Sequence, residues 1–266
     1  MNIFRRELRA RYRSIIAWSL SLFVLCIVSM AKYETITAQG GAAIQSMLAA
    51  FPSTVQAIFG MNGLDLTTVG GYFGVCFLLI ALTLSVHAGL LGASVIAQEE
   101  IDKTAEFLYV KPRSRRNILT AKLLAGIIIL VCVWGAATIG SIVGIQQFAH
   151  FGDFTADFWR MMGAAAHLQF FFFALGACIA TLVQKVRGYG RFISIAIFGS
   201  YVLYVLAKLS STFDIVHYLS VFSWFDAVDI LNTHALKLHY TLICILVSLI
   251  AITIVYVRYP QRDLTT

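Results

Sequence analysis

The 266-residue chain has little charge and little proline. Charged residues make up 12% of it, apolar residues 59%, and the mean hydropathy is +0.83. Soluble globular domains contain about 25% charged residues. This composition therefore excludes an ordinary water-soluble domain and indicates a membrane protein.

Motifs of nucleotide-binding and hydrolytic proteins are also absent. The sequence contains no G-x-x-x-x-G-K-[ST], no H-E-x-x-H and no G-x-S-x-G, which are the signatures of phosphate-binding loops, zinc proteases and serine hydrolases. No Asp or Glu falls inside an apolar run, so ion-coupled transport through a buried carboxylate is poorly supported. We expect no catalytic residue and no metal site in this chain.

Cysteine and proline are few and placed without a pattern. The five cysteines lie in apolar runs and form no C-x-x-C pair, which is typical of isolated buried thiols. The three prolines, at positions 52, 112 and 260, all lie outside these runs. Proline breaks or kinks a helix, so each run should form a continuous helix.

Six apolar runs approach or exceed the length of about 20 residues that a helix needs to cross a bilayer. They span Ile15–Ala31, Gly71–Ala97, Ile118–Gln147, Gly163–Val183, Phe192–Leu209 and Tyr240–Val257. The predicted fold class is an all-α membrane protein with six transmembrane helices in a single domain, residues 1–266.

Basic residues are distributed unevenly between the segments on one side of the membrane and those on the other. The two tails, the loop after the second run together with Lys122, and the loop after the fourth run carry 16 of the 20 Lys and Arg residues. By the positive-inside rule, these segments and both termini face the cytosol. The charge then complements anionic membrane lipid, and it does not require a nucleic-acid partner.

The N-terminal tail alternates apolar and basic residues at helical spacing. Residues 1–14 are therefore expected to form an amphipathic interfacial helix on the cytosolic side. The alternative is a cleaved signal peptide ending near Ala31, but the apolar run is longer than a usual signal sequence and five more runs follow it.

Two longer segments are expected on the external side. After Pro52, apolar residues fall on one helical face and predict a short helix resting on the membrane. Residues 210–239 are rich in aromatic and acidic residues, which predicts amphipathic helices that dip into the outer interface.

Small residues recur at four-residue intervals in the second and third runs, as at Gly89 and Gly140. Such stripes favour close helix packing within one chain, with subunit association as the alternative. Ser85, His87, Trp134 and Thr138 are candidates for lining a cavity. His87 lies near the expected bilayer midplane, where it is either a functional group or a neutral side chain bonded to a neighbouring helix.

The most charged stretch, residues 98–117, follows the second run. Ile101, Ala105 and Leu108 share one helical face, and the rest of the surface is acidic or mixed. Pro112 ends this helix, and Ser114 is placed to cap the next one. An ordinary loop between two transmembrane helices is usually flexible. A rigid helix in this position therefore favours a role in docking a cytosolic protein.

The pattern EE-x-D-K-T-A-E-F-L-x-x-K-P-x-S-R-x-x-I-x-x-A-K, residues 99–122, resembles the first cytosolic loop of ABC-2 family permeases. These are the membrane subunits of bacterial ATP-binding-cassette exporters. The external segment FPxxxQAIFGMNGLDL, residues 51–66, is similar to a branch described as drug or peptide-antibiotic exporters.

The resemblance implies that residues 99–109 form a coupling helix seated in a separate ABC ATPase, which holds the ATP and Mg²⁺. The implied contacts are Glu99, Glu100, Thr104, Glu106 and Phe107, with Pro112, Ser114 and Arg115 shaping the return and Lys185 and Arg187 in a second contact. It also implies two ATPase copies, a second permease copy and the bacterial plasma membrane. A lipophilic or amphipathic cargo, such as a drug or antimicrobial peptide, fits the uncharged spans. A non-transporting receptor or scaffold and a proton-coupled carrier using His87 are the alternatives.

Overall fold

The computed structural model describes residues 3–38, 50–101, 114–183, 188–209 and 214–261. Within these ranges all regular structure is helical. Six helices are long and apolar enough to cross a membrane. They are α1 (Ile3–Ala31), α5 (Val69–Ile101), α7 (Arg115–Phe148), α8 (Thr155–Leu182), α9 (Tyr189–Leu209) and α13 (Leu238–Arg258). The prediction of an all-α, six-span membrane protein is confirmed.

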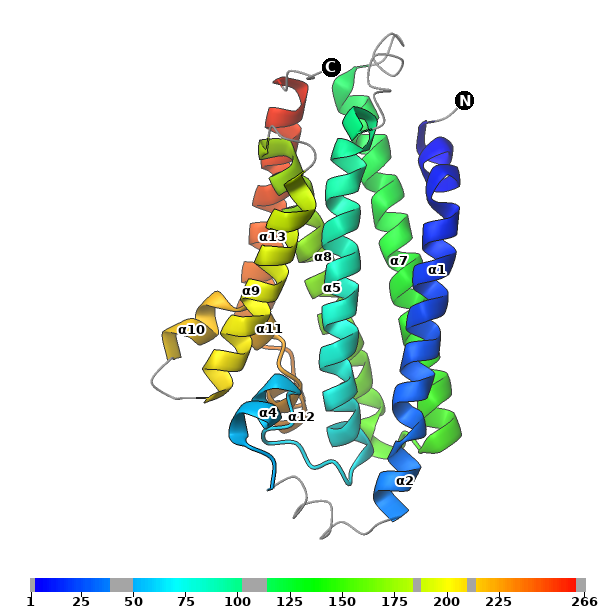
Figure 1. Cartoon of the computed structure of the whole chain (residues 1–266), viewed down its shortest axis with the longest axis vertical. Coiled ribbons are helices and arrows are strands. Elements are labelled where there is room, and N and C mark those ends of the chain that lie inside the picture. Colours follow the sequence, from blue (N-terminus) through cyan, green and yellow to red (C-terminus); the bar gives the residue numbers. More distant parts are fainter. Residues whose placement is uncertain (1–2, 39–49, 102–113, 184–187, 210–213, 262–266) are drawn as a thin grey trace.

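The six long helices are unbroken and lie side by side along the long axis of the molecule (Figure 1). Continuity follows from the absence of proline in their interiors. With 33 residues, α5 is about 50 Å long, well beyond a hydrocarbon core of about 30 Å. Its polar end therefore projects from the membrane, which is how a transmembrane helix reaches a soluble partner.

The N-terminal stretch differs from the expectation of an interfacial helix over residues 1–14. It continues without a break into the first span as part of α1. One reason is that Glu7 is only 6% exposed, paired with Arg6 and Arg11, while Arg11 is bonded to α5. These contacts hold the stretch against the bundle, where it forms the first turns of α1 rather than a separate helix.

Two helix pairs have the most extensive contacts among the described helices: α5 with α8 and α1 with α7. Gly92 faces the main-chain carbonyl of Phe173, and Gly176 faces that of Gly89, with no room for a Cβ atom at either glycine. On the other pair, a Cβ at Gly140 would lie 2.6 Å from the Phe23 carbonyl oxygen. The small-residue stripes thus pack within the chain, as predicted.

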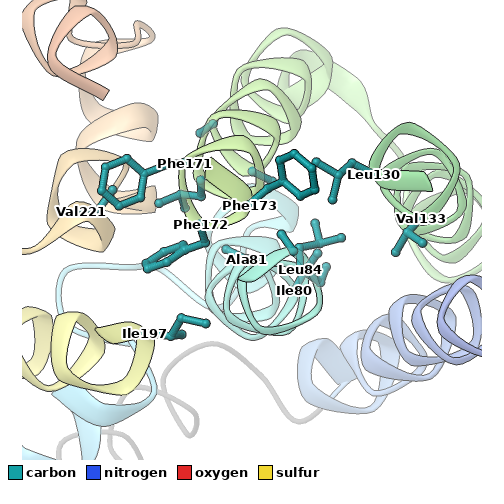
Figure 2. Close-up of a cluster of buried hydrophobic side chains, with 14 of the residues drawn as sticks. Ile80, Ala81, Leu84, Leu130, Val133, Phe171, Phe172, Phe173, Ile197 and Val221 are labelled. Atoms are coloured by element: carbon teal, nitrogen blue, oxygen red, sulfur yellow. The ribbon is translucent and has the colours of Figure 1, made fainter. Parts of the chain in front are cut away.

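Large apolar side chains fill the remaining space around α5. Figure 2 shows Phe171, Phe172 and Phe173 of α8 fanning out toward α11, α9 and α7, with Ile80 and Leu84 of α5 below them. Burying side chains of this size contributes through dense packing, because lipid tails are themselves apolar and water exclusion drives little of the association.

Short helices lie between the long ones, some at the end of the bundle opposite both termini and some beside its middle (Figure 1). They are α2 (Tyr33–Ala38), α4 (Ser53–Ile58), the single turn η1 (Gly152–Phe154), α10 (Asp214–Leu219), α11 (Val221–Trp224) and α12 (Ala227–Thr233), while a last turn, η4 (Tyr259–Gln261), follows α13. The predicted helix after Pro52 is present as α4. Its Ile58 carbonyl accepts a hydrogen bond from the Tyr201 hydroxyl of α9.

Residues 210–239 differ in part from the expected interfacial helices. In the described part, residues 214–239, the helices form, but Phe222, Phe225 and Ile230 are buried against the bundle. The Ser220 hydroxyl donates to the Ser200 carbonyl of α9 at 2.7 Å, and Asp226 pairs with Lys208. The described part of the segment therefore packs against α5, α8 and α9, while its outer residues, such as Tyr218, remain exposed.

Candidate functional site

The candidate site is the end of the bundle that holds both termini and the predicted cytosolic loops (Figure 1). We call it the docking end: the last turns of α5, the first turns of α7 and the end of α13. Glu99 and Glu100 lie in the last turn of α5. Thr104, Glu106, Phe107, Pro112, Lys185 and Arg187 lie outside the described residues, so their contacts remain predictions.

The start of α7 is defined by the predicted cap. The Ser114 hydroxyl accepts a hydrogen bond from the Asn117 amide at 3.3 Å, which satisfies one of the free N–H groups of the first turn. The next residue, Arg115, donates from Nη1 to the Pro260 carbonyl at 2.9 Å. One turn further, the hydroxyls of Thr120 and Tyr256 are 3.0 Å apart. The segment that leads from the charged loop into α7 is thus hydrogen-bonded to the end of α13 and to the turn that follows it.

A buried lysine forms a hydrogen bond between the two helices that flank the charged loop. Lys122 of α7 is 1% exposed, and its Nζ donates to the Val95 carbonyl of α5 at 2.7 Å. A buried ammonium is costly unless it is well bonded. This contact, which the sequence pattern did not reveal, bonds the neighbouring turns of α5 and α7 to each other.

We expect Lys122→Met to lower the free energy of unfolding by about 2 kcal/mol, because a hydrogen bond from a charged donor contributes roughly 1.5–3 kcal/mol. Titration with SDS in mixed micelles measures the change. Arg116→Met is the control, since Arg116 is exposed on the same helix and should change stability by less than about 0.5 kcal/mol. Equal losses in the two variants would contradict the role given to Lys122.

A family model described as "ABC-2 family transporter protein" matches residues 1–264. The chain belongs to the ABC-2 transporter family. No curated protein matches it. The ABC-2 protein is therefore a multi-pass membrane permease of an ABC transporter, without catalytic activity of its own, and family membership implies association with an ABC ATPase.

Three of the four candidate cavity residues of the permease are held inside the bundle. The Ser85 hydroxyl donates to the Ala81 carbonyl of its own helix at 2.7 Å. The Trp134 indole donates to the Met162 carbonyl of α8, and the Thr138 hydroxyl donates to the Trp134 carbonyl, each at 2.9 Å. The Trp134 bond joins α7 to α8, the other two bonds lie within their own helices, and none of the three residues lines the cavity described next.

His87 of the permease does line a cavity, of about 280 Å³, whose walls come from α1, α5, α7 and α9. Its ring is 4% exposed and packs against Trp18 with the ring centroids 5.0 Å apart. Arg11, Ser14, Ser94 and Tyr189 join it in the lining. Sequence reasoning missed these four, because residues on three separate helices show no common spacing along the chain.

Proposed function

We propose that this permease is the membrane subunit of an ABC exporter in the bacterial plasma membrane, with both termini in the cytosol. Its cargo is lipophilic or amphipathic, such as a drug or an antimicrobial peptide. Two permease copies and two ATPase subunits form the complex, and the ATPases hold ATP and Mg²⁺. The observation that carries the proposal is the family match over residues 1–264.

The docking end supports the way in which ATP binding would act on the bundle. Residues 99–109 sit in a groove of the ATPase, and Lys185 and Arg187 make a smaller contact. When two ATPases close on ATP, they push the docked segments of the two permeases together. Since Lys122 bonds to Val95, α5 and α7 tilt as one body and change the access of a cavity between the two permeases.

The uncharged spans support the choice of cargo. No Asp or Glu lies in the middle of a span, and the exposed faces of α9 and α13 are apolar, as at Phe198 and Leu246. A cavity built from such surfaces has no group to compensate a strongly charged solute in a low-dielectric medium. An amphipathic cargo can instead partition into it from the bilayer.

We expect the double reversal Glu100→Lys/Glu106→Lys to abolish co-purification of the partner ATPase, because each substitution replaces an attractive charge with a repulsive one across the contact. The probe is the ABC ATPase encoded beside this gene, identified by its Walker A sequence, co-expressed with the tagged permease. The measurements are the ATPase-to-permease ratio after affinity purification and the rate of ATP hydrolysis.

The matched control is Glu34→Lys/Asp153→Lys, the same charge change at the opposite end of the bundle. It should leave the ratio unchanged. An ATPase that stays bound to the Glu100/Glu106 variant with unchanged ATP turnover would refute the docking role of these residues. A neighbouring gene that encodes no Walker A protein would favour a receptor or scaffold instead.

A further inference from the structure

Three exposed arginines lie on one face of the first turns of α1. Arg5, Arg9 and Arg13 follow one another at four-residue spacing, and each is exposed. A step of four residues turns a helix by only about 40° and advances about 6 Å along its axis, so the three side chains leave the helix on one face. The other side, with Ile3 and Glu7, is buried against the bundle. We name these three arginines the basic stripe.

The basic stripe has no acidic partner in the described part of the chain. Neither Arg5 nor Arg9 takes part in a hydrogen bond or an ion pair with a described residue. Arg13 donates from Nε to the Tyr12 hydroxyl at 2.9 Å, and its guanidinium carbon lies 5.7 Å from the centre of the Tyr12 ring. Both of these contacts are with a neutral group. The stripe therefore presents three positive charges, none of them paired with a described carboxylate.

The same face of α1 continues as an apolar stripe. It consists of four side chains, again at four-residue spacing, that are 47–60% exposed: Ile16, Leu20, Val24 and Val28. The helix is long and apolar enough to cross a membrane and lies at the edge of the bundle (Figure 1). Exposed apolar side chains on such a helix suit the hydrocarbon layer. The change from Arg13 to Ile16 therefore marks the level at which this face of α1 enters the hydrocarbon.

The helical rise gives the distance of each arginine from this level. Arg13, Arg9 and Arg5 lie about 5, 11 and 17 Å beyond Ile16 along the helix. The headgroup layer on each side of a bilayer is about 5–8 Å thick. Arg13 is thus within the headgroup layer, and the long side chain of Arg9 reaches back into it. Arg5 lies further out, about one Debye length from the phosphates at 0.1 M salt.

The continuity of the two stripes favours a lipid over a protein as the partner. A molecule that covers both must have an anionic head followed by hydrocarbon, which is the structure of an anionic phospholipid. A second permease copy that placed its own basic stripe against this one would instead bring like charges together, which is unfavourable.

We propose that the basic stripe binds the headgroup of an anionic phospholipid in the leaflet at the docking end. Arg13 and Arg9 donate to the phosphate oxygens, Arg5 attracts the headgroup from further out, and the lipid chains lie along Ile16 and Leu20. A guanidinium forms strong, charge-assisted hydrogen bonds with phosphate. In a zwitterionic lipid the cation of the headgroup offsets the phosphate charge, so the stripe selects anionic lipid. The proposal goes beyond the proposed function, since it requires neither an ATPase nor transport.

The test is native mass spectrometry of the full-length permease in dodecyl maltoside, without any ATPase. The permease is titrated with dioleoylphosphatidylglycerol or with dioleoylphosphatidylcholine, which share their chains and differ in net charge. We expect the first phosphatidylglycerol to bind at least about tenfold more tightly than phosphatidylcholine, because each basic residue near an anionic surface contributes a factor of about five.

The triple variant Arg5→Gln/Arg9→Gln/Arg13→Gln should bind the two lipids with affinities within about threefold of each other. All three side chains are exposed, so the variant should fold, and its thermal melting curve verifies this.

The matched control removes three exposed arginines at the ends of three other helices, α7, α9 and α13: Arg116→Gln/Arg191→Gln/Arg258→Gln. The loss of charge is the same, but these residues do not form one stripe. The control should keep the preference of at least about tenfold for phosphatidylglycerol.

Equal affinity of the unmodified permease for the two lipids would overturn the proposal, and so would an equal loss of preference in the two triple variants. If the stripe variant keeps the full preference but no longer co-purifies with the ABC ATPase, the stripe belongs to the ATPase contact and the lipid proposal is wrong. Because the lipid titration contains no ATPase, its result does not depend on the docking role of Glu100 and Glu106.

Discussion

Replacing Gly92 or Gly176 with alanine is expected to separate α5 from α8 and to lower the free energy of unfolding by about 3 kcal/mol or more. At each position the new Cβ would overlap a main-chain carbonyl, that of Phe173 for Gly92 and that of Gly89 for Gly176. A side chain can change its rotamer, but a helix backbone cannot retreat alone. The whole interface, the most extensive in the permease, must therefore open.

The same substitution elsewhere in the long helices provides the control. Gly163 of α8 and Gly135 of α7 have nothing within 4 Å of an added Cβ. Alanine favours a helix over glycine by about 1 kcal/mol, so Gly163→Ala and Gly135→Ala should be neutral or stabilising. SDS titration and the folded fraction in size-exclusion chromatography measure all four variants. If the Gly92 and Gly176 variants behaved like these controls, the close approach of α5 and α8 would be wrong.

The second large effect is expected at the link between α9 and α12, where Asp226→Ala should cost about 3 kcal/mol. The side chain of Asp226 is 6% exposed and is paired with Lys208. It also accepts a hydrogen bond from the Tyr204 hydroxyl at 3.5 Å and one from the Val228 amide at 3.3 Å, which caps α12. Its removal leaves a partly buried lysine unpaired and releases α12 from α9.

A double-mutant cycle separates the ion pair from the cap. Lys208→Met/Asp226→Ala should be less destabilised than the sum of the two single variants, by about 1 kcal/mol or more, because it leaves no unpaired charge. The control pair is Lys237 and Asp229, 2.6 Å apart with about a third of each side chain exposed. The hydrogen bond from Lys237 to Asp229 raises the pKa of Lys237, so Lys237 is charged at neutral pH. Asp229→Ala should nevertheless cost no more than about 1 kcal/mol. A strictly additive cycle would show that Lys208 and Asp226 do not stabilise each other.

The sequence predicts the glycine contact in part, but it does not predict the pair of Asp226 and Lys208. The stripe that includes Gly89, with Gly92 beside it, predicts a close helix contact, since small residues at four-residue spacing lie on one face. The stripe does not identify the partner. The partner is α8, which contacts the stripe through Gly176. This pairing depends on the order of helices around the bundle, and helical spacing contains no information on that order.

Asp226 and Lys208 could not be paired from the sequence at all. Aromatic residues around Asp226 predicted helices at the membrane interface, but Phe222 and Phe225 are buried in the bundle instead. Either placement buries the same apolar side chains, one in lipid and the other in protein. The choice is made by specific bonds, such as that from Ser220 to the Ser200 carbonyl, which a local pattern does not show.

The sequence by itself determined the class of the protein, the six spans, the Ser114 cap and the family resemblance, because bilayer thickness, helical periodicity and turn chemistry act on neighbouring residues. Only the tertiary structure decided which helices touch, that Lys122 joins the two sides of the charged loop, and that Arg11, Ser94 and His87 meet at one cavity. These contacts join helices far apart in the chain. They depend on shape and on the pairing of buried polar groups, and therefore exist only once the helices have packed.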